Sequence, residues 1–217
     1  LVDGGYADRV VCATCSHFAT AERQYRFPLE LGNQRTPTAQ WTVTGAGATL
    51  LGRGEAKGLP LRLTAATIGR VVDKQQTDIN NMGAAMAPAA ADTLLAHLRD
   101  LHRSVQDYDL IVTGDLGCVG YDLMCLLCEQ KGVSLDGRYI DCGCEVFSPE
   151  QDVHAGGSGC GCSACCLNGW LFGRMLSGEI RRLLFLATGA LMSTTTSQQG
   201  ESIPAIAHAV TLEVEEG

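Results

Sequence analysis

The stretch from His154 to Cys166 reads H-A-G-G-S-G-C-G-C-S-A-C-C and leads into an amphipathic segment that predicts a helix. Gly156, Gly157 and Gly159 surround Ser158. Glycines let a loop turn several backbone N–H groups toward one point, and a helix N-terminus adds partial positive charge there. The stretch therefore predicts a place to hold an anion, for chemistry or for binding alone. A tight turn packed against a neighbouring strand, with no ligand, stays open as an alternative.

Strand-like and helix-like segments alternate along the rest of the 217 residues. The alternation predicts an α/β domain with a mostly buried sheet. Loops at Gly114, Gly156 and Gly189 should then gather at one edge of that sheet, where open α/β folds place ligands. The expected strands are 6–14, 40–51, 59–72, 108–113, 182–187 and 205–213, and the expected helices are 81–101, 119–131 and 162–177.

The overall composition excludes some partners and environments. The chain carries a net charge of −8, which argues against nucleic acid because that affinity rests on basic patches. No apolar run is long enough to predict a transmembrane helix, and no signal peptide is recognised at the start. The chain begins Leu1-Val2-Asp3 without Met, so we expect it to lack an N-terminal part.

The eleven cysteines favour reduced thiols over a disulfide scaffold, because the chain is long, their number is odd and no export signal is recognised. Three pairs have the C-x-x-C spacing of zinc ligands. We expect no metal site, because one pair falls within a predicted helix and another lies on a strand with its side chains pointing apart. Buried thiols are the interpretation that we prefer. The pairs are Cys12/Cys15, Cys125/Cys128 and Cys162/Cys165.

Five motifs together resemble the stage V sporulation protein AD family, and they cover nearly the whole chain. They are T-C-S-H-F-A-T-A-E-R-Q-Y-R-F-P (14–28), M-G-A-A-M-A-P-A-A-A-D-T (82–93), D-L-I-V-T-G-D-L (109–116), A-G-G-S-G-C-G-C-S-A (155–164), and A-T-G-A-L-M-S-T with Q-Q-G-E-S-I-P-A-I-A-H (187–208).

The resemblance implies a thiolase-like layered αβαβα fold made of two similar halves. This chain would hold the end of the first half, residues 1–75, and the second half, residues 76–217. The segment that carries the superfamily's cysteine nucleophile would then lie before Leu1.

The resemblance also implies a role. The family is expected to bind dipicolinic acid, as such or as its calcium chelate, and to help load it into the forespore during sporulation. It implies further partners in the spore VA membrane complex, a homodimer, and a location in the cytoplasm or at the forespore or spore inner membrane. It implies no cofactor.

The residues weigh against catalysis. Thiolase-like condensing enzymes need two side chains that donate hydrogen bonds to a thioester oxygen. By resemblance, the first should follow the strand at 109–113, where this chain has Gly114 and Asp115, and the second falls on Gly157. An aspartate at neutral pH accepts hydrogen bonds and repels an oxyanion. His154 could substitute as a donor. We nevertheless predict that this chain contributes no catalytic residue.

A ligand with two carboxylates suits the remaining groups better. The backbone N–H groups of Gly157, Ser158 and Gly159 and the Ser158 hydroxyl could bind one carboxylate, with His17 or His154 as a further donor. The predicted ligand-binding set is His17, Asp115, His154, Gly156, Gly157, Ser158 and Gly159. The alternatives are a condensing enzyme of the beta-ketoacyl synthase III type, or a structural member of a membrane-associated complex with no ligand.

Three histidines outside this set receive structural interpretations. His97 and His102 lie in or just after a predicted helix and should be near the surface. His208 interrupts an apolar strand, which is more typical of a hydrogen-bonded core histidine than of a ligand.

Overall fold

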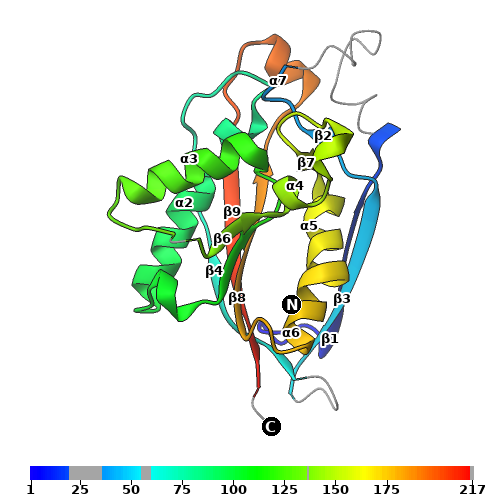
Figure 1. Ribbon diagram of the computed structural model, residues 1–217, viewed down its shortest axis with the longest axis vertical. Helices are drawn as coiled ribbons and strands as arrows, with labels where there is room; N and C mark the ends of the chain where they lie inside the picture. The colour runs from blue at the N-terminus through cyan, green and yellow to red at the C-terminus, as the bar shows by residue number, and fades with distance from the viewer. Residues whose placement is uncertain (20–35, 55–59, 136, 216–217) are drawn as a thin grey trace.

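The computed structural model describes residues 1–19, 36–54, 60–135 and 137–215. Its centre is a five-stranded sheet (Figure 1). The middle strand pair β5 and β8 is parallel, β6 adds to β5 in parallel, and β9 and β4 follow β8 in antiparallel pairing. In spatial order the strands are β4 (Leu61–Ile68), β9 (Ala205–Val214), β8 (Arg182–Ala190), β5 (Leu110–Thr113) and β6 (Tyr139–Asp141).

Helices cover both faces of the sheet. On one face lie α2 (Met82–Asp100) and α3 (Gly117–Glu129), and on the other lie α5 (Cys160–Cys166), the π-helical turn η4 (Leu167–Leu171) and α6 (Phe172–Leu176). Because successive strand residues point to opposite faces, β5 divides its side chains between two cores. Ile111 packs in the α2–α3 core, while Val112 packs in the core beneath α5.

A two-stranded hairpin of β1 (Arg9–Ser16) and β3 (Gly45–Gly52) lies on the far side of α5. Its inner face contacts α5, where Thr14 donates a hydrogen bond to Cys160 O at 2.9 Å. Gly47 allows this close approach, since a Cβ atom there would lie 2.6 Å from Ala164 O. Val11, Ala13, Cys15, Ala46, Ala48 and Leu50 alternate with these inward positions and are exposed.

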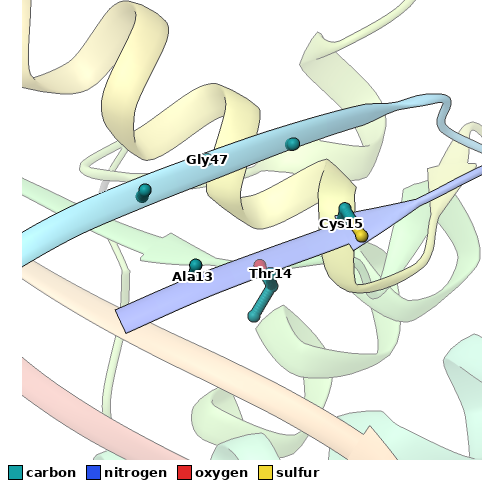
Figure 2. A pocket seen from close by; sticks show the side chains of 6 residues that line it. Ala13, Thr14, Cys15 and Gly47 are labelled. Carbon is teal, nitrogen blue, oxygen red and sulfur yellow. The ribbon is translucent and has the colours of Figure 1, made fainter. Parts of the chain in front are cut away.

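Small side chains leave a shallow hollow of about 500 Å³ at the centre of the hairpin. Figure 2 shows Ala13, Thr14 and Cys15 on β1, with Gly47 on the neighbouring strand and a helix behind them. Through its contacts with α5, the hairpin forms a further layer over that helix.

The remaining elements are short and connect these layers. They are β2 (Trp41–Thr42), which pairs in parallel with β7 (Gly157–Ser158), the helices α4 (Cys142–Glu145) and α7 (Thr194–Gln198), and the 3₁₀ turns η2 (Val105–Asp107) and η3 (Pro149–Gln151). Within the described ranges, no helix has the length and apolar character needed to cross a membrane.

Most expected elements are present, with shifted bounds. The expected strand 40–51 divides into β2 and β3, and the expected helix 162–177 begins at Cys160 and contains the π-helical turn. Gly132 and Gly178 follow α3 and α6 with φ of 77° and 80°, as expected for helix-stopping glycines. The sequence did not indicate β6, α4 or α7.

The division of the chain at residue 75 stays a prediction. Strand β4 precedes that position, yet it forms one edge of the five-stranded sheet whose other strands follow it. Segments from both predicted halves therefore share one sheet.

Two of the histidine predictions are wrong, in opposite directions. His97 is fully buried, whereas His208 is exposed and accepts a hydrogen bond from Gly69 N–H. His97 lies with Nδ1 2.7 Å from Thr67 Oγ1 and Nε2 2.7 Å from Tyr108 Oη. Burial is the main cause that lowers the pKa of His97 to about 4, and the nearby Arg103 guanidinium lowers it further.

We expect His97 to make the fold sensitive to acid. The unfolded chain binds a proton at His97 near pH 6.5 and the folded chain does so only near pH 4, so stability is present above pH 6.5 and is lost as the pH falls toward 4. His97→Asn should weaken this dependence by roughly 2–3 kcal/mol between pH 7 and 4, measured by urea unfolding.

His102→Asn is the matched control, because His102 is exposed and its φ of 53° suits asparagine. An unchanged pH profile in the His97 variant, or an equal change in both variants, would contradict this assignment.

Candidate functional site

The carboxylate of Asp141 is the centre of hydrogen bonding at the carboxyl-terminal edge of the sheet. Asp141 ends β6 and is fully buried. Its Oδ1 accepts N–H groups of Gly117 at 2.8 Å and Gly143 at 2.9 Å. Its Oδ2 accepts the Thr113 hydroxyl at 2.6 Å and the Leu116 N–H at 2.9 Å. Burial raises the pKa of Asp141 to about 7, although the hydrogen bonds from Thr113, Leu116 and Gly117 act in the opposite direction.

These hydrogen bonds fix the loop from Gly114 to Gly117 and, with it, Asp115. Asp115 Oδ1 accepts the Thr188 hydroxyl at 2.8 Å, and its Oδ2 accepts the Gly159 N–H at 3.0 Å. Burial raises the pKa of Asp115, and these two hydrogen bonds oppose the shift. An acidic side chain of this chain therefore contacts the glycine-rich turn, at a donor that sequence analysis assigned to a ligand.

Gln40 joins the two loops from a third side. Its Nε2 donates to Asp115 O at 2.9 Å and to Gly157 O at 2.8 Å. The neighbouring backbone continues the contact, since Trp41 N–H donates to Gly156 O and Val43 N–H donates to Ser158 O. The turn is thus held by β2 along one side and by Asp115 at its end.

The glycines of the turn allow close packing of backbone. A Cβ atom at Gly156, whose φ is 97°, would collide with Gly143 O. At Gly157 a Cβ atom would lie 2.5 Å from Val146 Cγ1 and 3.0 Å from Val43 Cγ2. Gly157 therefore has no space for a larger side chain unless Val146 and Val43 move.

The structure brings some predicted site residues together and leaves others apart. Asp115, Gly156, Gly157, Ser158 and Gly159 form one cluster, with Ser158 half-buried and its hydroxyl making no hydrogen bond to the described residues. The expected meeting of the Gly114 and Gly156 loops is confirmed, and Thr188, beside Gly189, joins them. A ligand role for these groups stays a prediction.

The two histidines of the predicted set are both exposed. His17 directly follows Ser16, whose hydroxyl accepts the Gly161 N–H at the start of α5. His154 Nδ1 lies 3.1 Å from Thr36 O, so this ring nitrogen contacts the surface loop. His17 is therefore one residue from a contact with α5, the helix that directly follows the cluster. The His154 ring instead contacts Thr36, which lies outside the cluster.

An aromatic hollow lies beside the turn. It measures about 500 Å³, and the Phe18 ring stacks on the Trp41 ring with their centroids 5.0 Å apart and their planes 13° apart. The hollow shares Val43 and Val146 with the packing around Gly157. Its lining comprises Phe18, Trp41, Thr42, Val43, Thr44, Val146, Phe147, Gln151 and Cys165.

The cysteines behave mainly as small side chains. Cys142, Cys162 and Cys166 are buried between α4 and α5, and the interaction with Cys166, followed by burial, raises the pKa of the Cys142 and Cys162 thiols. Cys125 and Cys128 lie within α3 as expected. Throughout the part of the chain that the structure describes, no three His, Cys, Asp or Glu side chains are arranged to hold a metal ion.

Comparison with known proteins decides the family. The family model of stage V sporulation protein AD matches residues 1–213. The chain belongs to this family. A curated member, stage V sporulation protein AD of Bacillus subtilis strain 168, is 47% identical over 213 residues, which are 98% of this chain and 62% of that protein. The chain therefore spans less than two thirds of that relative's length.

Solved structures show the thiolase-like fold. The 3-oxoacyl-(acyl carrier protein) synthase III of Pseudomonas aeruginosa PAO1 superposes with a TM-score of 0.56 at 14% identity, over 99% of this chain and 62% of that chain. The corresponding synthase of Aquifex aeolicus VF5 gives 0.55 at 12% identity, over 98% and 60%. The expected fold class is confirmed. At such identities the likeness extends to the fold alone.

Sequence reasoning missed the residues that organise the site. Gln40, Thr188 and Asp141 each hold the loops by contacts between residues far apart along the chain. The sequence Tyr139-Ile140-Asp141, apolar residues and then an acid before Cys142-Gly143, is a signal that could have indicated a strand ending in a capping carboxylate. The residues 20–28 of the first family motif lie outside the described ranges.

Replacing Asp141 should give a pH-dependent loss of stability. Because its pKa is raised in the folded state, folding is most favoured with Asp141 protonated, and this stabilisation is lost as the pH rises from about 4 to 7. Asp141→Asn places an NH₂ group among N–H donors, so it should cost about 1–3 kcal/mol at pH 5 and less at pH 8, in urea unfolding.

Asp92→Asn provides the comparison, since Arg70 pairs with Asp92 near the surface and lowers its pKa. A cost of Asp141→Asn that grows from pH 5 to pH 8 would contradict the raised pKa.

Adding one methyl group at Gly157 should destabilise the turn. Gly157→Ala forces Val146 and Val43 to shift, at a cost of about 1–3 kcal/mol. Thermal unfolding should show a lower midpoint than Gly169→Ala, where a Cβ atom meets nothing within 4 Å. Equal midpoints for the two variants would show that the turn is not close-packed.

Proposed function

We propose that the family protein containing this chain binds dipicolinic acid without chemical turnover and serves its loading into the forespore. Membership of the stage V sporulation protein AD family supports a role in sporulation. The ligand and its transport are our proposal. They rest on what the sequence motifs imply and on the geometry of the candidate site.

The observation that carries the non-enzymatic part is the position of Asp115. It occupies the loop where a thiolase-like condensing enzyme needs a hydrogen-bond donor to a thioester oxygen. Both of its carboxyl oxygens already accept hydrogen bonds, from Thr188 and from Gly159. In this geometry Asp115 is an acceptor. The close packing around Gly157 leaves no second donor side chain at the other expected position.

A planar aromatic diacid suits the groups that remain. The Ser158 hydroxyl can donate to a carboxylate, and the exposed His17 is one residue from the Ser16 contact with α5. The hollow beside the turn presents the stacked rings of Phe18 and Trp41, and aromatic rings favour further stacking with a flat ring. Several weak contacts would have to act together, because each contributes about 0.5–1.5 kcal/mol.

We also propose that the complete protein acts as a homodimer with other proteins of the spore VA membrane complex, in the cytoplasm or peripherally at the forespore or spore inner membrane. Association through partners, rather than by a helix of its own, is compatible with the described helices, none of which is suited to span a membrane.

Titration calorimetry on the complete protein tests the proposal. We expect heat with dipicolinate and less affinity for isophthalate, which has the same two carboxylates but no ring nitrogen. Ser158→Ala should weaken dipicolinate binding by about 2- to 10-fold, since one hydrogen bond is lost. Ser177→Ala, at the end of α6, is the matched control and should bind as the wild type does.

Two results would overturn the proposal. Absence of heat at millimolar dipicolinate would show that dipicolinate is not the ligand. Recovery of the protein with the membrane complex regardless of dipicolinate would then favour a structural role. Turnover of an acyl-coenzyme A thioester by the complete protein would instead show a condensing enzyme.

A further inference from the structure

Two cysteines lie in the first turns of adjacent helices at the Asp141 carboxylate. Gly117 N–H and Gly143 N–H donate to the same oxygen, Asp141 Oδ1, at 2.8 Å and 2.9 Å. The residues that directly follow these glycines are Cys118 on α3 and Cys144 on α4. The shared oxygen therefore brings the first turns of both helices together, with the Cys118 and Cys144 thiols as neighbours.

This thiol pair combines proximity with access from solvent. Cys118 is exposed and Cys144 is half-buried. Burial raises the pKa of Cys144, with the neighbouring Cys118 thiol as the next cause, so Cys118 is the thiol that an external reagent would meet first.

Three other groups of cysteines in the described ranges lack one of these two properties. Cys142, Cys162 and Cys166 contact one another but are buried. Cys12 and Cys15 are exposed, yet their spacing on β1 places them on opposite faces of the hairpin. Cys160 donates from Sγ to the backbone oxygen of Cys15 rather than facing its thiol.

We propose that Cys118 and Cys144 form a redox-active dithiol, a site of reversible disulfide formation by low-molecular-weight disulfides of the glutathione type. The pair lies in α3 and α4, which also supply two of the four donors to Asp141. Oxidation would link these helices covalently at the base of the loop that carries Asp115.

The reaction balances in two exchange steps. The Cys118 thiolate attacks one sulfur of oxidised glutathione, so the glutathione S–S bond breaks, a Cys118–glutathione disulfide forms and one glutathione thiolate leaves and is protonated. The Cys144 thiolate then attacks Cys118 Sγ, forming the Cys118–Cys144 bond and releasing the second glutathione. The protein loses two electrons and two protons, and glutathione disulfide gains them.

The bond should stabilise the site rather than distort it. A disulfide needs Cα atoms within about 7 Å of each other, which neighbouring first turns anchored on one oxygen can supply. It would close a loop that contains β6 and reduce the freedom of the unfolded chain. We therefore expect the oxidised protein to unfold at a higher denaturant concentration than the reduced protein.

The test treats the reduced complete protein with oxidised glutathione, alkylates the remaining thiols and maps peptides without reduction by mass spectrometry. The wild type should yield a Cys118–Cys144 cross-linked peptide, lighter than its two parts by the mass of two hydrogens. Cys144→Ser should stop at the Cys118–glutathione disulfide, and Cys118→Ser should give neither product. Cys12→Ser is the matched control on an exposed thiol and should still cross-link.

The contradicting results are equally specific. A wild-type protein that retains glutathione on Cys118 without closing the second bond overturns the proposal, as does a Cys118 that stays unmodified while Cys12 reacts. A cross-link that forms but leaves the unfolding midpoint unchanged would overturn the stabilising role assigned to it.

Discussion

The buried carboxylate of Asp141 is the interaction on which the functional edge of this protein depends. Its two oxygens collect donors from the end of β5, the loop after it, the start of α3 and the start of α4. Three of these donors are buried backbone N–H groups, which would be costly to leave unsatisfied. Burial of the carboxyl group is unfavourable to its charge, which appears as a pKa raised to about 7. One acidic side chain thus sets the path of the loop that carries Asp115.

As a consequence, the glycine turn donates a hydrogen bond to a side chain of the protein itself. Asp115 bonds the N–H of Gly159, and Gln40 bonds the carbonyl oxygens on both loops. This chain shares its fold with 3-oxoacyl-(acyl carrier protein) synthases, and in it the loop after β5 presents a hydrogen-bond acceptor to the glycine turn. Our proposal of binding without catalysis rests on the polarity of this one position rather than on the architecture around it.

Local patterns in the sequence predicted the elements better than their connections. Short apolar runs located β5, β8 and β9, and the glycines after α3 and α6 ended those helices as expected. The carboxylate network could not be foreseen in the same way, because Thr188 and Asp141 reach the site through pairing between distant strands. His97 and His208 show the same limit. Their burial depends on which layer covers each strand face, and periodicity alone does not reveal it.

The candidate site could be predicted from the sequence only in part. Asp115 and the glycine turn were expected together and do meet, whereas the ring of His154 contacts a surface loop. The glycines predicted that backbone segments approach each other closely, but not which group would contact the turn. That group is the carboxylate of Asp115. A single sequence cannot show whether such a turn binds a carboxylate of the protein or one of a ligand.

Hydrogen exchange of the Gly159 amide measures most directly whether Asp141 controls the turn through Asp115. The Gly159 N–H should be protected in the complete wild-type protein and should exchange faster in both Asp115→Ala and Asp141→Asn, although Asp141 does not touch Gly159. Asp92→Asn should leave it unchanged. Fast exchange in the Asp115 variant together with wild-type protection in the Asp141 variant would contradict the account, because the turn would then not depend on the buried carboxylate.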